Sequence, residues 1–177
     1  MTDHGRSRPT PMIRDEMVAL LPRLRRFCHA RTRSVEAGDD LTQSTIERAL
    51  SRIEQWQPGT RLDSWMFRIA QNISIDEGRA RTRRGVHIDV DALAGATGED
   101  GRRVVEDRSD LARVRQAIAA LPDDQRTLVA LVIIDGQSYK EAAAIVDVPI
   151  GTVMSRLSRA RHFIDNFVNA AGRGLPA

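Results

Sequence analysis

Near the carboxyl end of the chain, hydroxyl and guanidinium side chains follow one another at helical spacing. The members of this row are Thr152, Ser155, Arg156, Ser158, Arg159 and Arg161. Between positions 149 and 164 the sequence holds three arginines and no acidic residue. Guanidinium and hydroxyl groups bind phosphates and the acceptor edges of guanine, so the row indicates recognition of nucleic acid.

The residue types that build enzyme active sites are scattered along the chain. The four histidines show no ligand spacing, no glycine-rich phosphate loop is present, and the acids Asp39 and Asp40 lie where a helix is expected to begin. Cys28 is the only cysteine, so it can form no internal disulfide and is expected in the core. We therefore expect a protein that is not an enzyme, with no catalytic residues, no cofactor and no metal site.

The polar row lies on the second helix of a predicted helix-turn-helix. Ser138 and Glu141 have the spacing of a capping box at the start of a short first helix. A tight turn is expected at 147–148, and Pro149 suits the first position of the second helix. The buried face of that helix is predicted to carry Val153, Leu157 and Ala160. The alternative is an ordinary helical hairpin whose arginines are merely solvated.

The rest of the sequence predicts an all-α protein with two small helical domains. Aromatic residues make up 4% of the chain, and apolar residues recur at intervals of three and four positions. The predicted layout is a disordered amino-terminal tail (1–11), a first domain (12–84), a linker (85–108), a helix-turn-helix domain (109–168) and a carboxyl-terminal tail (169–177). No stretch approaches the roughly 18 apolar residues of a membrane span, so no membrane insertion is expected.

Three helices are expected in the first domain. They cover residues 13–27, 37–53 and 64–84. Pro22 is expected to bend or interrupt the first helix, and Asp39 and Asp40 favour the start of the second. Thr60 and Asp63 resemble a capping box for the third.

The segment between the domains has the composition of a flexible acidic linker. Between Gly85 and Asp110 the helical period fades, and seven acids against three arginines give a local charge of −4. Glycine occurs there at positions 95, 98 and 101.

Five stretches of the sequence carry a family resemblance. In the carboxyl-terminal half they are 121–126 (LPDDQR), 136–142 (GQSYKEA) and 148–161 (VPIGTVMSRLSRAR), and in the amino-terminal half they are 40–50 (DLTQSTIERAL) and 61–76 (RLDSWMFRIAQNISID). They closely resemble the extracytoplasmic-function (ECF, group IV) sigma factors, which belong to the sigma-70 family of RNA polymerase subunits. With their connections, these stretches extend over about residues 12–168.

The resemblance implies an alternative sigma factor that binds core RNA polymerase and directs transcription initiation at specific promoters. Its implied partners are core polymerase, promoter DNA and an anti-sigma factor. The family also implies a response to stress and a place in the cytoplasm, associated with the nucleoid.

In the family, the helix that matches 40–50 docks on the clamp helices of the largest polymerase subunit. The resemblance therefore implies polymerase contacts at Asp40, Gln43, Ser44 and Leu50. Asp40 has an alternative role as a helix cap, and the two roles do not exclude each other.

The stretch 61–76 resembles the helix that melts the minus-ten promoter element. The loop at 57–63 resembles the segment that captures a flipped base of the non-template strand. The residues assigned to minus-ten DNA are Trp56, Arg68, Asn72, Asp76, Arg79 and Arg83. Asn72 matches a position that lines the base pocket in relatives, and a purely structural role is its alternative.

Three aromatic residues near this helix are candidates for stacking on bases. Trp65 has the spacing of a core residue. Phe67 is undecided between the core and base stacking. Trp56 is expected to be the exposed aromatic residue.

The resemblance assigns the second helix of the helix-turn-helix to the major groove of the minus-thirty-five element. The implied contacts are Thr152, Ser155, Arg156, Ser158 and Arg159. Many relatives carry lysine or arginine where this chain has Met154. A polar contact there is lost or replaced by an apolar one, which predicts a different preferred element.

Two other functions compete with this interpretation. A sigma-like decoy would sequester an anti-sigma factor without binding promoters, but known decoys are fused to a phospho-receiver domain, for which 177 residues leave no space. A simple helix-turn-helix repressor would bind palindromes as a dimer, and the resemblance of 40–50 to a polymerase-binding helix argues against it.

Overall fold

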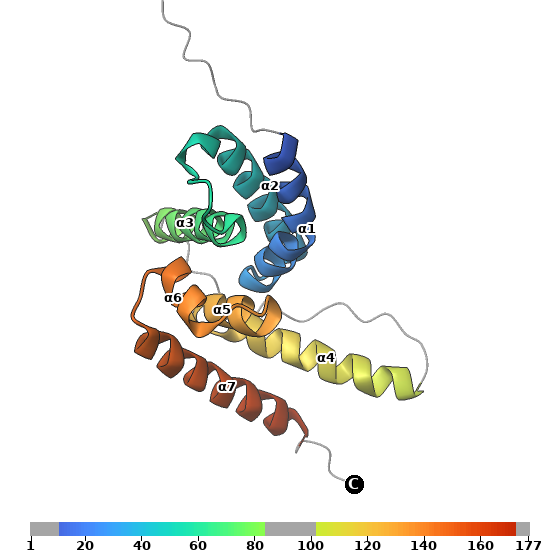
Figure 1. Cartoon of the computed structure of the whole chain (residues 1–177). Coiled ribbons are helices and arrows are strands. Elements are labelled where there is room, and N and C mark those ends of the chain that lie inside the picture. Colours follow the sequence, from blue (N-terminus) through green and yellow to red (C-terminus); the bar gives the residue numbers. More distant parts are fainter. Residues whose placement is uncertain (1–10, 84–101, 173–177) are drawn as a thin grey trace, which may run out of the picture.

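The computed structural model describes residues 11–83 and 102–172, and every regular element in these ranges is helical (Figure 1). In chain order the elements are α1 (Pro11–Arg31), α2 (Val35–Ser51), η1 (Ile53–Gln55), α3 (Leu62–Arg83), α4 (Arg102–Ala120), α5 (Asp123–Leu128), η2 (Val129–Ile134), α6 (Tyr139–Val146) and α7 (Ile150–Gly172). Helices α1 to α3 form the first domain and α4 to α7 the second. The predicted all-α fold of two helical domains is therefore confirmed.

The boundaries of the predicted tails and linker differ from the helices observed. α4 begins at Arg102, inside the range predicted as linker, and α7 continues past residue 168 to Gly172. The sequence from 102 to 108 contains no glycine or proline to end a helix. Residues 84–101, 1–10 and 173–177 lie outside the described residues.

α1 is one continuous helix through Pro22, which was predicted to bend or interrupt it. The Pro22 side chain is exposed, so water can solvate the carbonyl that loses its backbone hydrogen bond there. Met17 and Phe27, on either side, are buried. Packing therefore holds both halves of α1 in one helix.

α2 begins at Val35, several residues before Asp39 and Asp40, which were predicted to favour its start. Ser34, in extended backbone, caps the helix by accepting a hydrogen bond at Oγ from the backbone N–H three residues later, at 3.2 Å. Asp40 thus lies in the second turn and is not the cap. Asp39 instead binds α1, with Nε2 of His29 at 2.8 Å and Nε of Arg25 donating at 2.9 Å. The contact with His29 and the hydrogen bond from Arg25 lower the pKa of Asp39.

α3 begins without the predicted capping box. Thr60 Oγ1 donates to the backbone carbonyl of Gln57 at 2.7 Å and closes a turn at Gly59, whose φ of +88° lies in the region that favours glycine. The Asp63 carboxylate accepts two hydrogen bonds from Arg61. Thr60 and Asp63 therefore form hydrogen bonds with different partners and not the capping box that the sequence predicted.

The predicted helix-turn-helix is formed by α6 and α7. Ser138 Oγ accepts from the Glu141 N–H at 3.2 Å, and Glu141 Oε2 accepts from the Ser138 N–H at 2.8 Å, which completes the capping box. Asp147 ends α6 in the left-handed conformation, with φ of 54°. The chain then turns into α7, which begins directly after Pro149.

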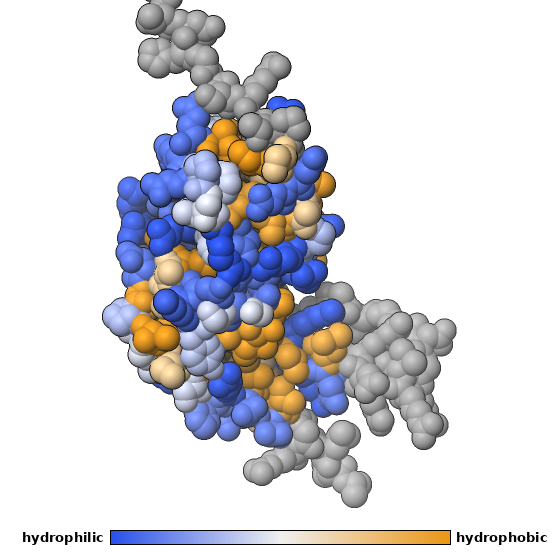
Figure 2. All heavy atoms as spheres, in the orientation of Figure 1, coloured by the Kyte–Doolittle hydropathy of each residue, from blue (hydrophilic) through white to orange (hydrophobic). Residues whose placement is uncertain are grey.

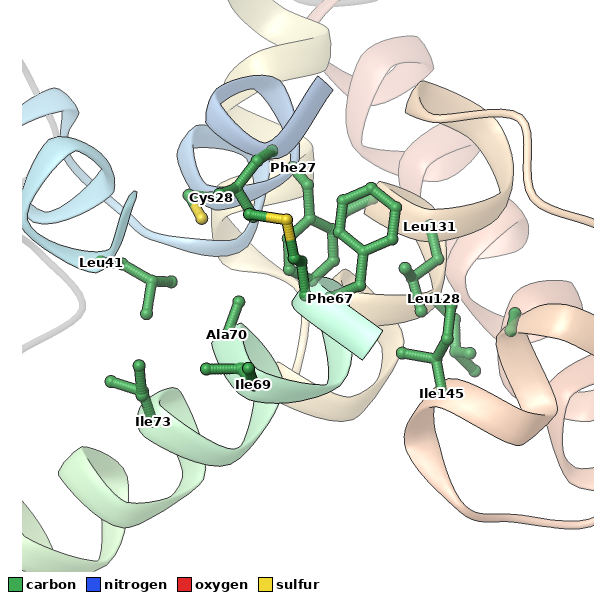
Figure 3. Close-up of a cluster of buried hydrophobic side chains, with 14 of the residues drawn as sticks. Phe27, Cys28, Leu41, Phe67, Ile69, Ala70, Ile73, Leu128, Leu131 and Ile145 are labelled. Carbon is green, nitrogen blue, oxygen red and sulfur yellow. The ribbon is translucent and has the colours of Figure 1, made fainter. Parts of the chain in front are cut away.

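The two domains share one hydrophobic core. Phe27 of α1 and Phe67 of α3 are fully buried, with ring centroids 5.0 Å apart. Figure 3 shows Leu128 and Leu131 of the second domain on the side of Phe67, within the same buried cluster. Cys28 lies in this core as predicted, and burial raises the pKa of its thiol to about 11. The second domain is thus packed against the first through apolar contacts.

The surface in Figure 2 is largely hydrophilic, with an apolar strip in the lower half of the view, over the second domain. The exposed large apolar side chains of this domain are Leu111, Ile133, Ile150, Met154, Phe163 and Phe167. In the part of the chain that the structure describes, no helix is both long enough and apolar enough to cross a membrane.

Candidate nucleic-acid interface

α7 presents the predicted polar row to solvent. Val153, Leu157 and Ala160 are buried, as expected for the opposite face. Ser155, Ser158, Arg159 and Arg161 are exposed, and Thr152 and Arg156 are half-buried. Met154 is 54% exposed within the row, so one apolar side chain lies among the polar ones.

The arginines of the row have different partners. Arg156 Nε forms an ion pair with Asp124 Oδ2 of α5 at 2.9 Å. Arg159 Nε donates to the backbone carbonyl one turn earlier at 3.3 Å, and Arg161 Nη2 donates to the hydroxyl of Tyr139 at 3.2 Å. Arg156 is therefore oriented by a second helix, whereas the hydrogen bond of Arg159 among the described residues stays within α7. Asp124 was not predicted as a site residue, although it lies in the LPDDQR stretch.

The predicted polymerase-contact residues lie on one side of α2. Asp40, Gln43 and Leu50 are exposed, and Ser44 is half-buried. Leu41, on another side of the helix, is 2% exposed. Gln43 Nε2 donates to Glu47 Oε1 at 3.0 Å, which adds Glu47 to this face.

The predicted minus-ten residues of α3 form one exposed stripe. They are Arg68, Asn72, Asp76, Arg79 and Arg83, all exposed and spaced by three or four residues. Asp76 Oδ2 lies 4.0 Å from Nη1 of Arg48 in α2. At the start of the stripe, Arg68 donates a hydrogen bond to the backbone carbonyl of Ala144 in α6.

Two aromatic predictions need correction. Trp56, expected to be exposed, is half-buried against the core, and its indole nitrogen is buried with no hydrogen-bond partner among the described residues. The turn η1 explains this, because the Trp56 N–H donates to the carbonyl of Ile53 at 3.1 Å and folds the residue back. Phe67 is a core residue, whereas Trp65, predicted in the core, is half-buried at its edge.

A pocket of about 340 Å³ lies beside the loop at 57–63. Its lining includes Arg61, Trp65 and Arg68 of the first domain, together with Ala144 and Ile145 of α6. Asn72, one turn beyond Arg68, is not part of this lining. An aromatic face beside two guanidinium groups suits a nucleobase and its phosphate.

Asp63 positions one side of the pocket. Its carboxylate accepts from Arg61 Nε and Nη2 at 3.0 and 2.6 Å, and Arg23 Nη2 lies 3.2 Å away. Burial disfavours the charged form, but the hydrogen bonds from Arg61 and from the backbone N–H of Ser64, with the charge of Arg61, lower the pKa of Asp63 to about 2. An ionised Asp63 therefore fixes Arg61 beside the loop.

Comparison with known protein families matches both halves of the chain. The family described as "Sigma-70, region 4" matches residues 111–164, which contain the helix-turn-helix. The "Sigma2 domain of PhyR" matches residues 17–71, which contain α2 and the start of α3.

Individual proteins match over most of their length. The ECF RNA polymerase sigma factor EcfG of Rhodopseudomonas palustris is 35% identical over 152 residues, covering 86% of this chain and 82% of the relative. The ECF RNA polymerase sigma-E factor of Escherichia coli K12 is 35% identical over 148 residues, covering 77% and 78%.

Two solved structures are also similar. The sigma factor RpoE of Bartonella quintana, crystallised with the anti-sigma factor NepR, has a TM-score of 0.73 and 30% identity, with 89% of this chain and 97% of that chain covered. CnrH in complex with the cytosolic domain of CnrY has a TM-score of 0.66 at 21% identity and shares the fold, with 93% and 92% covered. Taken with the helix-turn-helix and the exposed faces of α2, α3 and α7, the identity over most of the chain shows that this protein belongs to the ECF sigma factors of RNA polymerase.

Proposed function

We propose that three exposed helix faces of this sigma factor share the work of transcription initiation. The α2 face at Asp40, Gln43, Ser44 and Leu50 binds the clamp helices of the largest subunit of core polymerase. The stripe on α3, together with the loop at 57–63, holds the melted minus-ten element. The polar row on α7 enters the major groove of the minus-thirty-five element.

The observation that carries the proposal is the exposed row on α7. Its arginines and hydroxyls lie on the side of a helix whose opposite face is buried, so they can enter a groove together. A bidentate arginine on guanine contributes about 1–3 kcal/mol of discrimination. The exposed side chain of Met154 suits an apolar contact, such as a thymine methyl group.

On α3, we assign the backbone of the single strand to Arg68, Arg79 and Arg83, because guanidinium groups release counterions from phosphates. Asn72 pairs with the edge of the flipped base, for which an amide offers both a donor and an acceptor. Trp56 supports the loop from the core side, since it is half-buried.

The proposal for how this protein is regulated rests on the partner of one relative. The Bartonella quintana relative was crystallised with an anti-sigma factor. We propose that an anti-sigma factor holds this chain inactive until a stress signal releases it. The chain then acts in the cytoplasm, associated with the nucleoid, and has no catalytic activity because the polymerase makes the RNA.

Run-off transcription with purified core polymerase, on promoters adjacent to the gene, tests this function. We expect a transcript with a defined start that requires both the chain and the core enzyme. Capture of an anti-sigma factor without any transcript would instead support the decoy. Binding of palindromic duplexes by the chain alone, with no affinity for core, would support the repressor.

A further inference from the structure

A second and larger cavity lies where α1 and α2 of the first domain meet α4 and η2 of the second. Its volume is about 1190 Å³, whereas ligand pockets of proteins enclose about 300–1,000 Å³. None of the residues assigned to polymerase or promoter DNA is part of its lining. The cavity is therefore large enough for a small molecule, and the proposed function leaves it without a role.

Basic side chains are concentrated in the lining of this cavity. Four arginines and one histidine take part in it, namely Arg25, Arg26, His29, Arg33 and Arg115. Among the described residues, no acidic side chain lines the cavity. Arg115 belongs to α4, so both domains contribute positive charge. This lining complements a negatively charged ligand.

Two of the basic side chains already have a structural partner. Arg25 Nε donates to Asp39 Oδ1 at 2.9 Å, and His29 Nε2 lies 2.8 Å from the same oxygen. The backbone fits tightly here, since a Cβ on Gly38 would lie 2.5 Å from Cδ2 of His29 and 2.9 Å from its Cα. Arg25 and His29 therefore join α1 to α2, and other arginines must bind the ligand.

The remaining three arginines are available to an anion. Arg26, Arg33 and Arg115 are exposed, and none of them forms an ion pair with another residue of the ranges 11–83 and 102–172. A guanidinium group binds a carboxylate through two parallel hydrogen bonds. These arginines can therefore accept the charged end of a ligand without breaking a contact within the described chain.

Most of the other lining side chains are aliphatic. The half-buried ones are Leu21 and Ala30 of α1, Ile46 of α2, Ile118 of α4 and Ile134 of η2. No phenylalanine, tyrosine or tryptophan of the described residues lines the cavity, although aromatic side chains are the surfaces on which nucleobases stack. The lining thus suits a hydrocarbon chain better than a nucleotide.

We propose that this cavity binds a long-chain fatty acid, with its hydrocarbon chain against the aliphatic side chains and its carboxylate among Arg26, Arg33 and Arg115. Because the lining is mostly apolar, the single charge of a carboxylate costs less to desolvate there than the two charges of a phosphate. The ligand contacts both domains at once, so its binding stabilises the folded chain by mass action.

Isothermal titration calorimetry of the full chain with dodecanoate, below the concentration at which micelles form, tests this proposal. We expect saturable binding of one molecule per chain and a melting temperature that rises with dodecanoate concentration. Octanoate should bind on the order of tenfold more weakly or worse, because it has four fewer methylene groups to bury.

Three other ligands test whether the carboxylate and the chain are both read. Dodecyltrimethylammonium has the chain with a positive head group, and binding as tight as that of dodecanoate would show unspecific adsorption and overturn the proposal. Tighter binding of dodecyl phosphate would overturn the assignment to a carboxylate. A designed amphipathic helix of leucine and glutamate that binds where dodecanoate does not would assign the cavity to a protein partner instead.

Two sets of variants locate the site. Arg33→Gln combined with Arg115→Gln should weaken dodecanoate binding on the order of tenfold, since a charge-assisted pair is lost on each side of the cavity. Ala119→Phe should also weaken it, because Ala119 lines the cavity and the larger ring fills part of the space. The matched control is Arg14→Gln with Arg52→Gln, which removes the same charge from exposed arginines outside the lining.

Equal affinities of the parent, the Arg33 and Arg115 double variant and the control would overturn the proposal. Circular dichroism checks that each variant is folded, and the double variant decides the question if Ala119→Phe does not fold. Run-off transcription tests the proposed function separately. Either conclusion can therefore fail while the other stands.

Discussion

Two arginines of α7 differ in how their side chains are held in the free protein. Arg156 is oriented by its ion pair with Asp124, and Arg159 donates a hydrogen bond within its own helix. An arginine held in place loses less conformational freedom when it meets a base. Arg156 is therefore the better candidate for a base contact, and Arg159 for a phosphate contact.

We expect Arg156→Ala to reduce binding of a minus-thirty-five duplex by about 1–3 kcal/mol and to relax specificity at one position. Arg159→Ala should weaken all sequences alike and lower the salt dependence of binding. Fluorescence anisotropy on single-base variants at several salt concentrations measures both effects, with exposed Arg115→Ala as the control. The recognition-helix assignment is wrong if neither change affects a minus-thirty-five-dependent promoter.

Asn72→Ala should slow formation of the open complex more than binding to duplex DNA, because a base is read only after it leaves the stack. The exposed Asn72 lies one turn beyond Arg68, next to the pocket rather than in its lining. The measurement compares holoenzyme binding to a promoter with a pre-melted bubble. Asn166→Ala, at an exposed position in α7, is the control. Unchanged strand affinity and base preference would leave Asn72 a structural role.

Asp63 makes stability depend on acid pH. Its pKa falls from 3.8 to about 2 on folding, so its contribution is complete above the unfolded value and is lost as the pH falls through the folded value. We expect Asp63→Asn to lower the free energy of unfolding by about 2 kcal/mol at pH 7. Between pH 5 and pH 2, the free energy of unfolding of the parent, measured with urea, should fall by about this amount more than that of the variant. Identical pH profiles would contradict the assignment.

Among the secondary elements, α2 is stabilised and proposed to bind polymerase through different residues. Ser34 caps the helix from outside the proposed polymerase face, whereas Asp40 and Gln43 lie on that face. Helix formation and polymerase contact therefore depend on different residues of one element.

Asp40→Ala combined with Gln43→Ala should weaken binding to core polymerase on the order of tenfold, or ~1.4 kcal/mol, with unchanged helix content. Ser34→Ala should instead lower the free energy of unfolding by about 1 kcal/mol and leave the affinity for core polymerase unchanged. Biolayer interferometry with immobilised core measures affinity, and circular dichroism measures helix content. Equal core affinity of parent and double variant would remove the α2 face from the interface.

Across the whole molecule, the shared core predicts that the domains unfold together. Both tryptophans, Trp56 and Trp65, lie in the first domain, so their fluorescence reports on that domain, whereas circular dichroism reports on all helices. We expect the two urea transitions to coincide. Phe67→Ala, at the junction of the domains, should lower stability by about 3–5 kcal/mol in both signals. Separate transitions would show that the domains are stable independently.

The sequence by itself determined the helices, the capping box of α6 and the family. A helix depends on neighbours within four residues, so the spacing of Val153, Leu157 and Ala160 was enough to predict the buried face of α7. The same local rule failed where another group was available, since Ser34 rather than Asp40 caps α2. It also failed at Trp56, which a 3-10 turn folds onto the core.

Only the tertiary structure decided what joins the two domains. Arg23 and Asp135 are 112 positions apart, and Arg68 and Ala144 are 76 apart. No local period or propensity links such distant positions. Their pairing depends on how the shapes and charges of whole helices fit when both domains bury their apolar faces in one core. The exposed faces of the single helices therefore follow from local pattern, and the contact between α3 and α6 follows from packing between domains.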